Sequence, residues 1–250
     1  MLDFNHRPTI AEEINAFIDI GLQEKRAAQV EREYLGASRL GVSCGRALQY
    51  EYTKASKDED FKGQILRIFE IGHVFETLAL DWLRQAGFDI FTKKQNGEAF
   101  GFSVAGGRIR GHVDGIIHAA PAELGIRFPA IWECKSMNAK SWRDTVKHGL
   151  KKSKPIYAVQ IATYQAYMEG TVLGISANPA LFTAINKDTA EIYHELVPFD
   201  ASLAQEASDR AVNLIRATEI GEILPRIAMS DDHFECVFCP YRQRCWKVAA

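Results

Sequence analysis

Long apolar segments are absent from this sequence of 250 residues. The longest uncharged stretch of its second half, 170–186, has 17 residues and is interrupted by Gly174, Asn178 and Pro179. A membrane-spanning helix needs about 20 mostly apolar residues, so we expect no membrane partner. The first seven residues include Asp3 and lack the apolar core of a signal peptide. The protein is therefore expected in the cytoplasm.

Excess charge of either sign is also missing. The 30 Lys and Arg against 32 Asp and Glu leave a net charge of −2, which excludes a histone-like basic coat. A polyanion would have to bind at a local basic patch. Hydrophobic residues make up 47% and charged residues 25% of the chain, as in ordinary globular domains. This composition excludes disordered, collagen-like and coiled-coil proteins.

Cysteine is scarce, and two well-known catalytic signatures do not occur. Disulfides are rare in a reducing compartment, so the five cysteines must serve packing, catalysis or metal binding. The chain has no G-x-x-x-x-G-K-[ST] segment, which excludes a nucleotide-driven motor within it. It has no H-E-x-x-H segment either, and the glycines of 106–111 lack dinucleotide-binding spacing and indicate a tight turn.

The spacing of apolar residues predicts a mixed α/β fold with a central sheet flanked by helices. Thr9 and Glu12 form a capping-box pattern at the start of the first helix. Helices are predicted over about 10–33, 44–52, 63–86, 140–149, 156–168 and 201–219. Strands are predicted over about 88–92, 100–104, 109–117, 130–135, 180–185 and 190–197.

Acidic residues stand in three segments that such a fold can bring together. Glu76 is predicted on a helix, Asp114 on a strand, and Glu133 on a later strand. Side chains alternate along a strand, so Glu133 and Lys135 share one face while Cys134 points into the core. Carboxylates suit a hard ion such as Mg²⁺, which polarises a phosphoryl oxygen and activates water, and a nearby lysine can orient that water. Taken alone, each acid also fits an exposed strand edge or a plain turn.

The chain becomes basic after this strand. Residues 135–154 contain seven Lys and Arg and one acid, Asp144, which gives a local charge of +6. Such a segment can bind phosphates. Four lysines are candidates for DNA binding: Lys147, Lys151, Lys152 and Lys154. A solvated helix face is the alternative for them. Gln160 and Tyr164 are four apart on the next helix, so they project from one face.

The remaining cysteines fit a metal site. Three of them lie close together near the end of the chain: Cys236, Cys239 and Cys245. Three thiolates need a distant fourth ligand, and Cys44 is the only candidate once Cys134 is placed in the sheet. Soft thiolates select Zn²⁺ or an iron–sulfur cluster over hard ions. His233 keeps a mixed Cys/His zinc site open.

In chain order, four motifs resemble those of the RecB-type branch of the PD-(D/E)XK nucleases: Gly72-x-x-x-Glu76, Gly111-His-x-Asp114-Gly-Ile, Glu133-x-Lys135 and Gln160-x-x-x-Tyr164. The resemblance implies a restriction-endonuclease-like core that hydrolyses DNA phosphodiesters with Mg²⁺ or Mn²⁺. It implies a metal bound by Asp114, Glu133 and the backbone carbonyl of Cys134. Lys135 then acts on the water, and two residues position phosphate or the lysine: Gln160 and Tyr164.

One departure from the family pattern concerns the helix. Many RecB-type members have histidine four residues after the glycine, where this chain has Glu76. His73 stands one turn earlier on the same predicted helix. Glu76 is therefore the first choice as a further metal ligand, and His73 is the second.

One early cysteine and a terminal C-x2-C-x5-C that flank these motifs resemble AddB and the CRISPR-associated RecB-like nucleases. That resemblance implies a [4Fe–4S] cluster that joins the two parts of the chain, with Zn²⁺ as the alternative; its ligands would be Cys44, Cys236, Cys239 and Cys245. It predicts a single domain over 1–250, with a nuclease core over about 60–200 and a cluster subdomain over about 35–60 plus 220–250.

Together, these expectations predict that the protein is a metal-dependent DNA nuclease. The expected activity is that of an exonuclease acting on free DNA ends in recombination, repair or related processing. A helicase or a recombination protein is the expected partner. The rival interpretation is a catalytically idle nucleic-acid-binding protein whose cluster or zinc is structural. An endonuclease stays open within the enzyme class. The intact acid set with Lys135 favours the enzyme.

Overall fold

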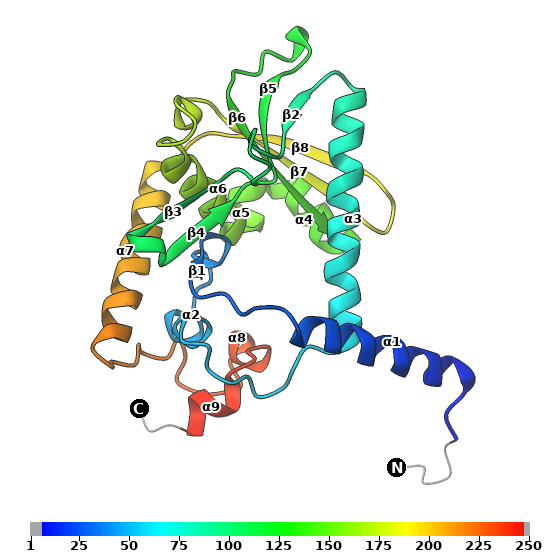
Figure 1. Cartoon of the computed structure of the whole chain (residues 1–250), viewed down its shortest axis with the longest axis vertical. Helices are drawn as coiled ribbons and strands as arrows, with labels where there is room; N and C mark the ends of the chain where they lie inside the picture. The colour runs from blue at the N-terminus through cyan, green and yellow to red at the C-terminus, as the bar shows by residue number, and fades with distance from the viewer. Residues whose placement is uncertain (1–6, 248–250) are drawn as a thin grey trace.

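A five-stranded mixed sheet forms the upper part of the computed structural model, which describes residues 7–247 (Figure 1). Its strand order is β2-β5-β6-β7-β8. The strands are β2 (Asp89–Phe91), β5 (Gly115–Ala119), β6 (Ala130–Met137), β7 (Ala180–Asn186) and β8 (Ile192–Val197). β6 and β7 are parallel, and the other neighbours are antiparallel. The predicted mixed α/β fold with a central sheet flanked by helices is confirmed.

A second, three-stranded sheet stands beside the first and was not predicted. It has the order β1-β4-β3 and is built from β1 (Leu35–Gly36), β3 (Gly101–Val104) and β4 (Ile109–His112). The prediction of one strand over 109–117 is wrong, because the chain bends at Asp114 and passes from one sheet to the other. The apolar pattern runs on through the bend, so only the tertiary contacts of Asp114 reveal it.

Helices cover both faces of the five-stranded sheet (Figure 1). On one face, α3 (Gly63–Gln85) packs Ala79 and Leu83 against Trp132 and its neighbours. On the other face, α6 (Pro155–Met168) packs between the two sheets, and α7 (Ala201–Glu219) packs against α6. Two shorter helices connect β6 to α6: α4 (Ala139–His148) and α5 (Leu150–Ser153). Burial of these apolar clusters is the main stabilising contribution to the fold.

The first helix, α1 (Ile10–Ala27), begins at the predicted capping box. Thr9 accepts a hydrogen bond from the Glu12 amide, and the Glu12 carboxylate accepts one from the Thr9 amide at 2.7 Å. The helix ends at Ala27 instead of near residue 33. It packs on α3 through polar pairs such as Lys25 with Glu70, 2.7 Å apart, while Phe17 stays 75% exposed.

The early and late parts of the chain meet at the lower end of the molecule (Figure 1). Three helices gather there: α2 (Gly45–Tyr52), α8 (Phe234–Val237) and α9 (Arg242–Lys247). The Asp58 amide donates to the Pro240 carbonyl at 2.7 Å, and the Gln49 side chain donates to the Glu222 carbonyl at 2.7 Å. Contacts between segments about 170 residues or more apart therefore hold this end together.

Short 3₁₀ turns complete the chain over Ala37–Arg39, Ala105–Gly107, Ala122–Leu124 and Ile175–Ala177. The predicted turn at 106–107 is the second of these, where Gly106 and Gly107 have positive φ angles of 64° and 87° that favour glycine. Within residues 7–247, no helix combines the length and the apolar character that crossing a membrane requires.

Candidate active site

The alternation of β6 separates its polar side chains as predicted. Cys134 points toward α3 and lies in the apolar cluster with Leu83, where it is 5% exposed. Glu133 lies on the opposite face and is fully buried. Lys135 follows on that same face with 23% of its side chain exposed. A glutamate buried inside a sheet needs partners, because an isolated buried charge is costly.

Glu133 finds partners for only one of its two carboxylate oxygens. Lys135 Nζ donates a hydrogen bond to Glu133 Oε1, and Gln160 Nε2 donates to the same oxygen at 2.6 Å. Oε2 is buried, and nothing in the described part of the chain hydrogen-bonds to it. Buried polar atoms are nearly always satisfied in folded proteins, so this oxygen stands out as one that can accept a further bond.

Asp114 reaches the same strand from the bend between β4 and β5. Its Oδ2 accepts a hydrogen bond from the backbone amide of Cys134 at 2.8 Å. This bond fixes the carboxylate beside the residue that follows Glu133. The bend and the neighbouring strand together bring the two acids into one site, although 18 residues of chain separate them.

The ionisation of these groups is strongly coupled. Burial, and after it the nearby charge of Asp114, raise the pKa of Glu133 to about 8. Burial and Asp114 also raise the pKa of Glu76. Burial alone would lower the pKa of Lys135, but Glu133 and Asp114 outweigh it and hold that pKa above its usual range. Three carboxylates therefore repel one another in a site that one ammonium group only partly neutralises.

Glu76 approaches this group from α3. Its pKa is sensitive to Asp114, Lys135 and His73, which shows that it lies within electrostatic reach of them. His73 Nδ1 is 3.8 Å from the Glu76 carboxylate, but 83% of the His73 side chain is exposed. Glu76 is therefore the less exposed of the two predicted α3 ligands, with 40% of its side chain exposed against 83% for His73.

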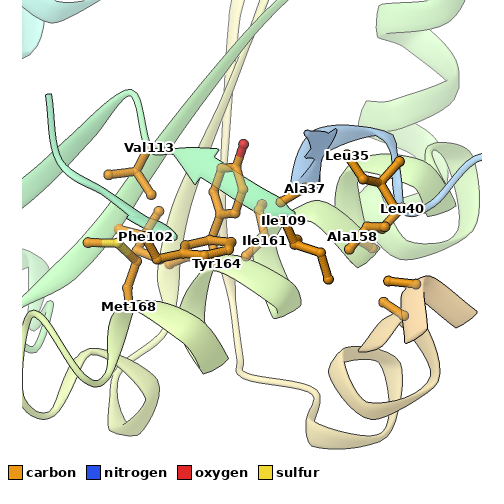
Figure 2. Close-up of a cluster of buried hydrophobic side chains, with 14 of the residues drawn as sticks. Leu35, Ala37, Leu40, Phe102, Ile109, Val113, Ala158, Ile161, Tyr164 and Met168 are labelled. Carbon is orange, nitrogen blue, oxygen red and sulfur yellow. The ribbon is translucent and has the colours of Figure 1, made fainter. Parts of the chain in front are cut away.

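Gln160 and Tyr164 project from α6 toward the same place but differ in their surroundings. Gln160 contacts Glu133 directly, whereas Tyr164 is 3% exposed and lies edge-on against Phe102, with ring centroids 5.9 Å apart (Figure 2). Burial raises the pKa of Tyr164, and the nearby charge of Glu133 adds to this effect. A Cβ on Gly111 would come within 2.8 Å of the Tyr164 ring, so glycine allows β4 to approach α6.

The donor set at this site fits a hard cation. Among the described residues, no three His, Cys, Asp or Glu side chains already converge as a ready-made metal cage. Mg²⁺, however, keeps several waters and is usually bound by one or two carboxylates. Glu133 Oε2 lacks a partner and Asp114 keeps a second oxygen beyond the one bonded to Cys134, so these two acids can supply such a pair.

The four predicted cysteine ligands line one cavity, but among the described residues they do not converge as a metal-binding group. A cavity of 290 Å³ between the early and late segments is lined by Cys44, Cys236, Cys239 and Cys245. Arg46 Nη1 donates to the Cys245 thiol at 3.9 Å, and burial raises the pKa of Cys236 and of Cys239. Aromatic side chains also line the cavity: Tyr50, Phe234, Phe238, Tyr241 and Trp246. Cys134 lies elsewhere, in the sheet, as predicted.

The structure divides the four predicted DNA-binding lysines. Lys147 and Lys154 line an open cavity of 570 Å³ along α4, which we call the basic groove. Lys151 instead pairs with Asp200 at 2.7 Å, and Lys152 is exposed without lining the groove. The groove also holds two cations from the basic segment that the prediction did not select: Lys140 and Arg143. Their spacing with Lys147 along one helix is the signal that would have found them.

The segment around Ser43 resembles a catalytic serine motif in spacing but lacks the structure that such a serine needs. Gly41-Val-Ser43-Cys-Gly45 fits the G-x-S-x-G spacing of nucleophilic serines, which need a sharp turn between a strand and a helix. Here a 3₁₀ turn, not a strand, precedes α2. The Ser43 hydroxyl donates to Glu235, so its bond goes to a carboxylate beside the cysteine cavity and not to a histidine base.

No family model matches this chain, and no curated protein matches it in sequence. Among solved structures, an alkaline exonuclease (LHK-Exo) from Laribacter hongkongensis is similar, with a TM-score of 0.52 and 14% identity over 80% of this chain and 93% of that chain. The same exonuclease in complex with dAMP is similar over 76% and 89%, again at a TM-score of 0.52 and 14% identity. At this identity the similarity shows a shared fold.

A third structure, that of SSO0001, aligns over 93% of this chain and 96% of that chain at 17% identity. Its TM-score of 0.49 is too low to add to the argument.

Proposed function

We propose that this chain is a metal-dependent deoxyribonuclease of the PD-(D/E)XK superfamily, acting as an exonuclease on free DNA ends. The observation that carries the proposal is the buried Glu133 carboxylate, which has Lys135 and Gln160 on one oxygen and, within residues 7–247, no hydrogen-bond partner on the other. A structural glutamate would satisfy both oxygens, whereas a metal ligand needs one to be available.

The acids would hold Mg²⁺ or Mn²⁺. Asp114, Glu133 and the Cys134 carbonyl are the proposed ligands, with Glu76 as a further one and His73 as the second choice at that position. Such an ion polarises a phosphoryl oxygen and lowers the pKa of bound water. The raised pKa values of Glu133 and Glu76 support this assignment, because burial and the charge of Asp114 raise them and a bound cation would offset both effects.

Lys135 is the proposed group for the attacking water. Its Nζ is bonded to Glu133 and lies 5.4 Å from the centre of the Tyr157 ring, so its position is fixed from two sides. Its charge can orient water and stabilise the negative charge that develops on the phosphate. Gln160 holds Glu133 through its hydrogen bond, and Tyr164 is the group proposed to position phosphate or the lysine.

DNA is the proposed substrate for two reasons. The exonuclease that shares this fold has been solved in complex with dAMP. The basic groove on α4 begins three residues after Lys135, so it lies along the chain directly beyond the acids. We propose that Lys140, Arg143, Lys147 and Lys154 contact phosphates there, because such contacts are electrostatic and independent of sequence.

The cysteine cavity is the proposed site of a [4Fe–4S] cluster, as in the RecB-like branch, with Zn²⁺ as the alternative. Four thiols from segments 192 residues or more apart line one cavity with aromatic side chains, which suits a buried thiolate-ligated group. The Arg46 guanidinium beside Cys245 can stabilise a thiolate. A cluster there would join residues of about 35–60 to those of about 220–250 in one domain with the nuclease core.

Digestion of DNA labelled at one end tests the proposal. Single-stranded, blunt double-stranded and covalently closed circular DNA are incubated with the protein in Mg²⁺, Mn²⁺ or EDTA. We expect mononucleotides or short products from linear DNA with either metal, none with EDTA, and an intact circle. Cleavage of the circle would indicate an endonuclease, and the absence of cleavage in every metal would refute the nuclease assignment.

A further inference from the structure

The outer face of the three-stranded sheet leads directly to the acids. Along β4, Ile109 and Gly111 are buried while Arg110 and His112 are exposed, as alternation on a strand requires. The antiparallel pairing with β3 continues to Val113, whose amide donates to the Phe100 carbonyl at 3.1 Å, and Asp114 follows. Arg110, His112 and Asp114 therefore form a row that ends at the candidate metal ligand.

The Tyr34 ring lies beside Arg110, at the end of the row that is farther from Asp114. The Arg110 guanidinium lies 5.1 Å from the centre of the Tyr34 ring, and the Arg32 guanidinium lies 6.0 Å from it. Arg110 Nε also donates to the Gly107 carbonyl at 3.1 Å, which fixes the guanidinium in place. A tyrosine beside two guanidinium groups combines a stacking surface with positive charge, the combination that binds single-stranded nucleic acids.

His112 forms the middle of the row. It pairs with Gly101 on β3, and a Cβ at Gly101 would lie only 2.8 Å from the His112 ring. The glycine therefore leaves room for the imidazole to lie across the neighbouring strand. An exposed flat ring at this point lies between the Tyr34 group and Asp114, and can stack on a base or donate to a phosphate.

Arg108, one step before β4, does not belong to this row. Its guanidinium pairs with Glu219 at 2.5 Å, so its charge is already compensated. The basic groove is also separate, because its residues lie on α4 and at the start of α6. The row and the groove are thus two different cationic features on different elements.

We propose that the Tyr34–Arg110–His112 face binds the single-stranded DNA segment next to the phosphate that is cleaved. Residues two apart on a strand are about 6.8 Å apart, comparable to the step between nucleotides of an extended single strand. His112 would then contact the nucleotide beside the cleaved phosphate, and Tyr34 with Arg110 would stack the base one step further away. This inference rests on the nuclease function proposed above and names the form of DNA its site accepts.

The test uses a short oligodeoxynucleotide that carries 2-aminopurine near one end, because stacking on an aromatic ring quenches this base. All proteins carry Glu133→Gln so that the DNA stays intact in Mg²⁺. Tyr34→Leu, which removes the ring, and Arg110→Ala, on an exposed position, are compared with two controls. Tyr34→Phe keeps the ring, and Arg127→Ala removes an equally exposed arginine from the loop between β5 and β6.

We expect Tyr34→Leu to abolish the quenching and to weaken single-strand binding about tenfold, the usual order for one lost stacking contact. Arg110→Ala should weaken it similarly, while Tyr34→Phe and Arg127→Ala should match the parent protein. Unchanged quenching and affinity in both Tyr34→Leu and Arg110→Ala, with cleavage by the unmodified chain intact, would overturn this inference alone. An unmodified chain that neither binds nor cleaves DNA would overturn the proposed function itself.

Discussion

Replacing Glu133 with glutamine should remove a pH dependence of stability that the metal-free protein possesses. The pKa of Glu133 is raised from 4.5 to about 8, first by burial and then by Asp114, so the folded state holds the proton more tightly than the unfolded state. Stability from this group is fully present below pH 4.5 and is lost as the pH rises through 8. Glutamine occupies the same volume and cannot ionise.

The size of the effect follows from the gap between the two pKa values. Each unit of pKa difference between the folded and unfolded states corresponds to about 1.4 kcal/mol. The rise from 4.5 to about 8 therefore means that full ionisation of Glu133 lowers the free energy of unfolding by up to about 5 kcal/mol. Lys135 keeps its proton throughout this range because its pKa is raised, so it adds no slope. Glu76 adds a slope of the same sign in both proteins, and the difference between them measures Glu133 together with its repulsion of Glu76.

Urea denaturation in EDTA, followed by circular dichroism at several pH values between 5 and 8, measures this difference. The wild type should lose stability relative to Glu133→Gln as the pH rises, and Mg²⁺ should restore it most at the highest pH. Glu123→Gln, at an exposed glutamate in the loop after β5, should behave as the wild type does. Parallel pH curves for wild type and Glu133→Gln, or no effect of Mg²⁺, would refute the reasoning.

Three further predictions concern other parts of the molecule. An iron–sulfur cluster should make anaerobically purified protein brown, and alanine at any cysteine of the cavity should remove this colour and lower the solubility of the protein. Cys134→Ala should keep the colour. Colourless unmodified protein with about one zinc would instead identify Zn²⁺. Joint alanine substitution of Lys147 and Lys154 should weaken DNA binding and reduce the slope of log affinity against log salt concentration by about two counterions. Lys151→Ala should change this slope little, because Lys151 already pairs with Asp200. Equal slopes for the double variant and the unmodified protein would contradict the prediction. Lys135→Ala should abolish cleavage and, above pH 8 where Glu133 is ionised, lower the free energy of unfolding by about 3 kcal/mol, because the buried Glu133 charge loses its partner. Unchanged stability in urea at that pH would refute the pairing.

The sequence was most informative where a local rule acts alone. Alternation along β6 places Glu133 and Lys135 on one face and Cys134 on the other, and the capping box marks the start of α1. The spacing of Cys236, Cys239 and Cys245, with Cys134 placed in the sheet, also left Cys44 as the fourth cysteine of the cavity. Each of these predictions depends on residue types and on a fixed period or spacing, which the sequence contains directly.

Features that depend on contacts between distant segments could not be predicted in this way. β1 has two residues and exists because Leu35 pairs with Ile109, far along the chain. The bend at Asp114 is held by the amide of Cys134, so an unbroken apolar pattern conceals it. Charge alone could not separate Lys151 from the groove lysines, because its partner lies on the N-terminal side of α7.

The rate at which Glu133→Gln degrades end-labelled DNA in Mg²⁺, relative to wild type and to Glu123→Gln, tests the central claim most directly. If the partnerless oxygen of Glu133 is a metal ligand, the rate should fall by about a hundredfold or more while DNA binding is retained, since the variant keeps the size of the side chain and loses only its charge. Glu123→Gln should keep the wild-type rate. Full activity in Glu133→Gln would contradict the account.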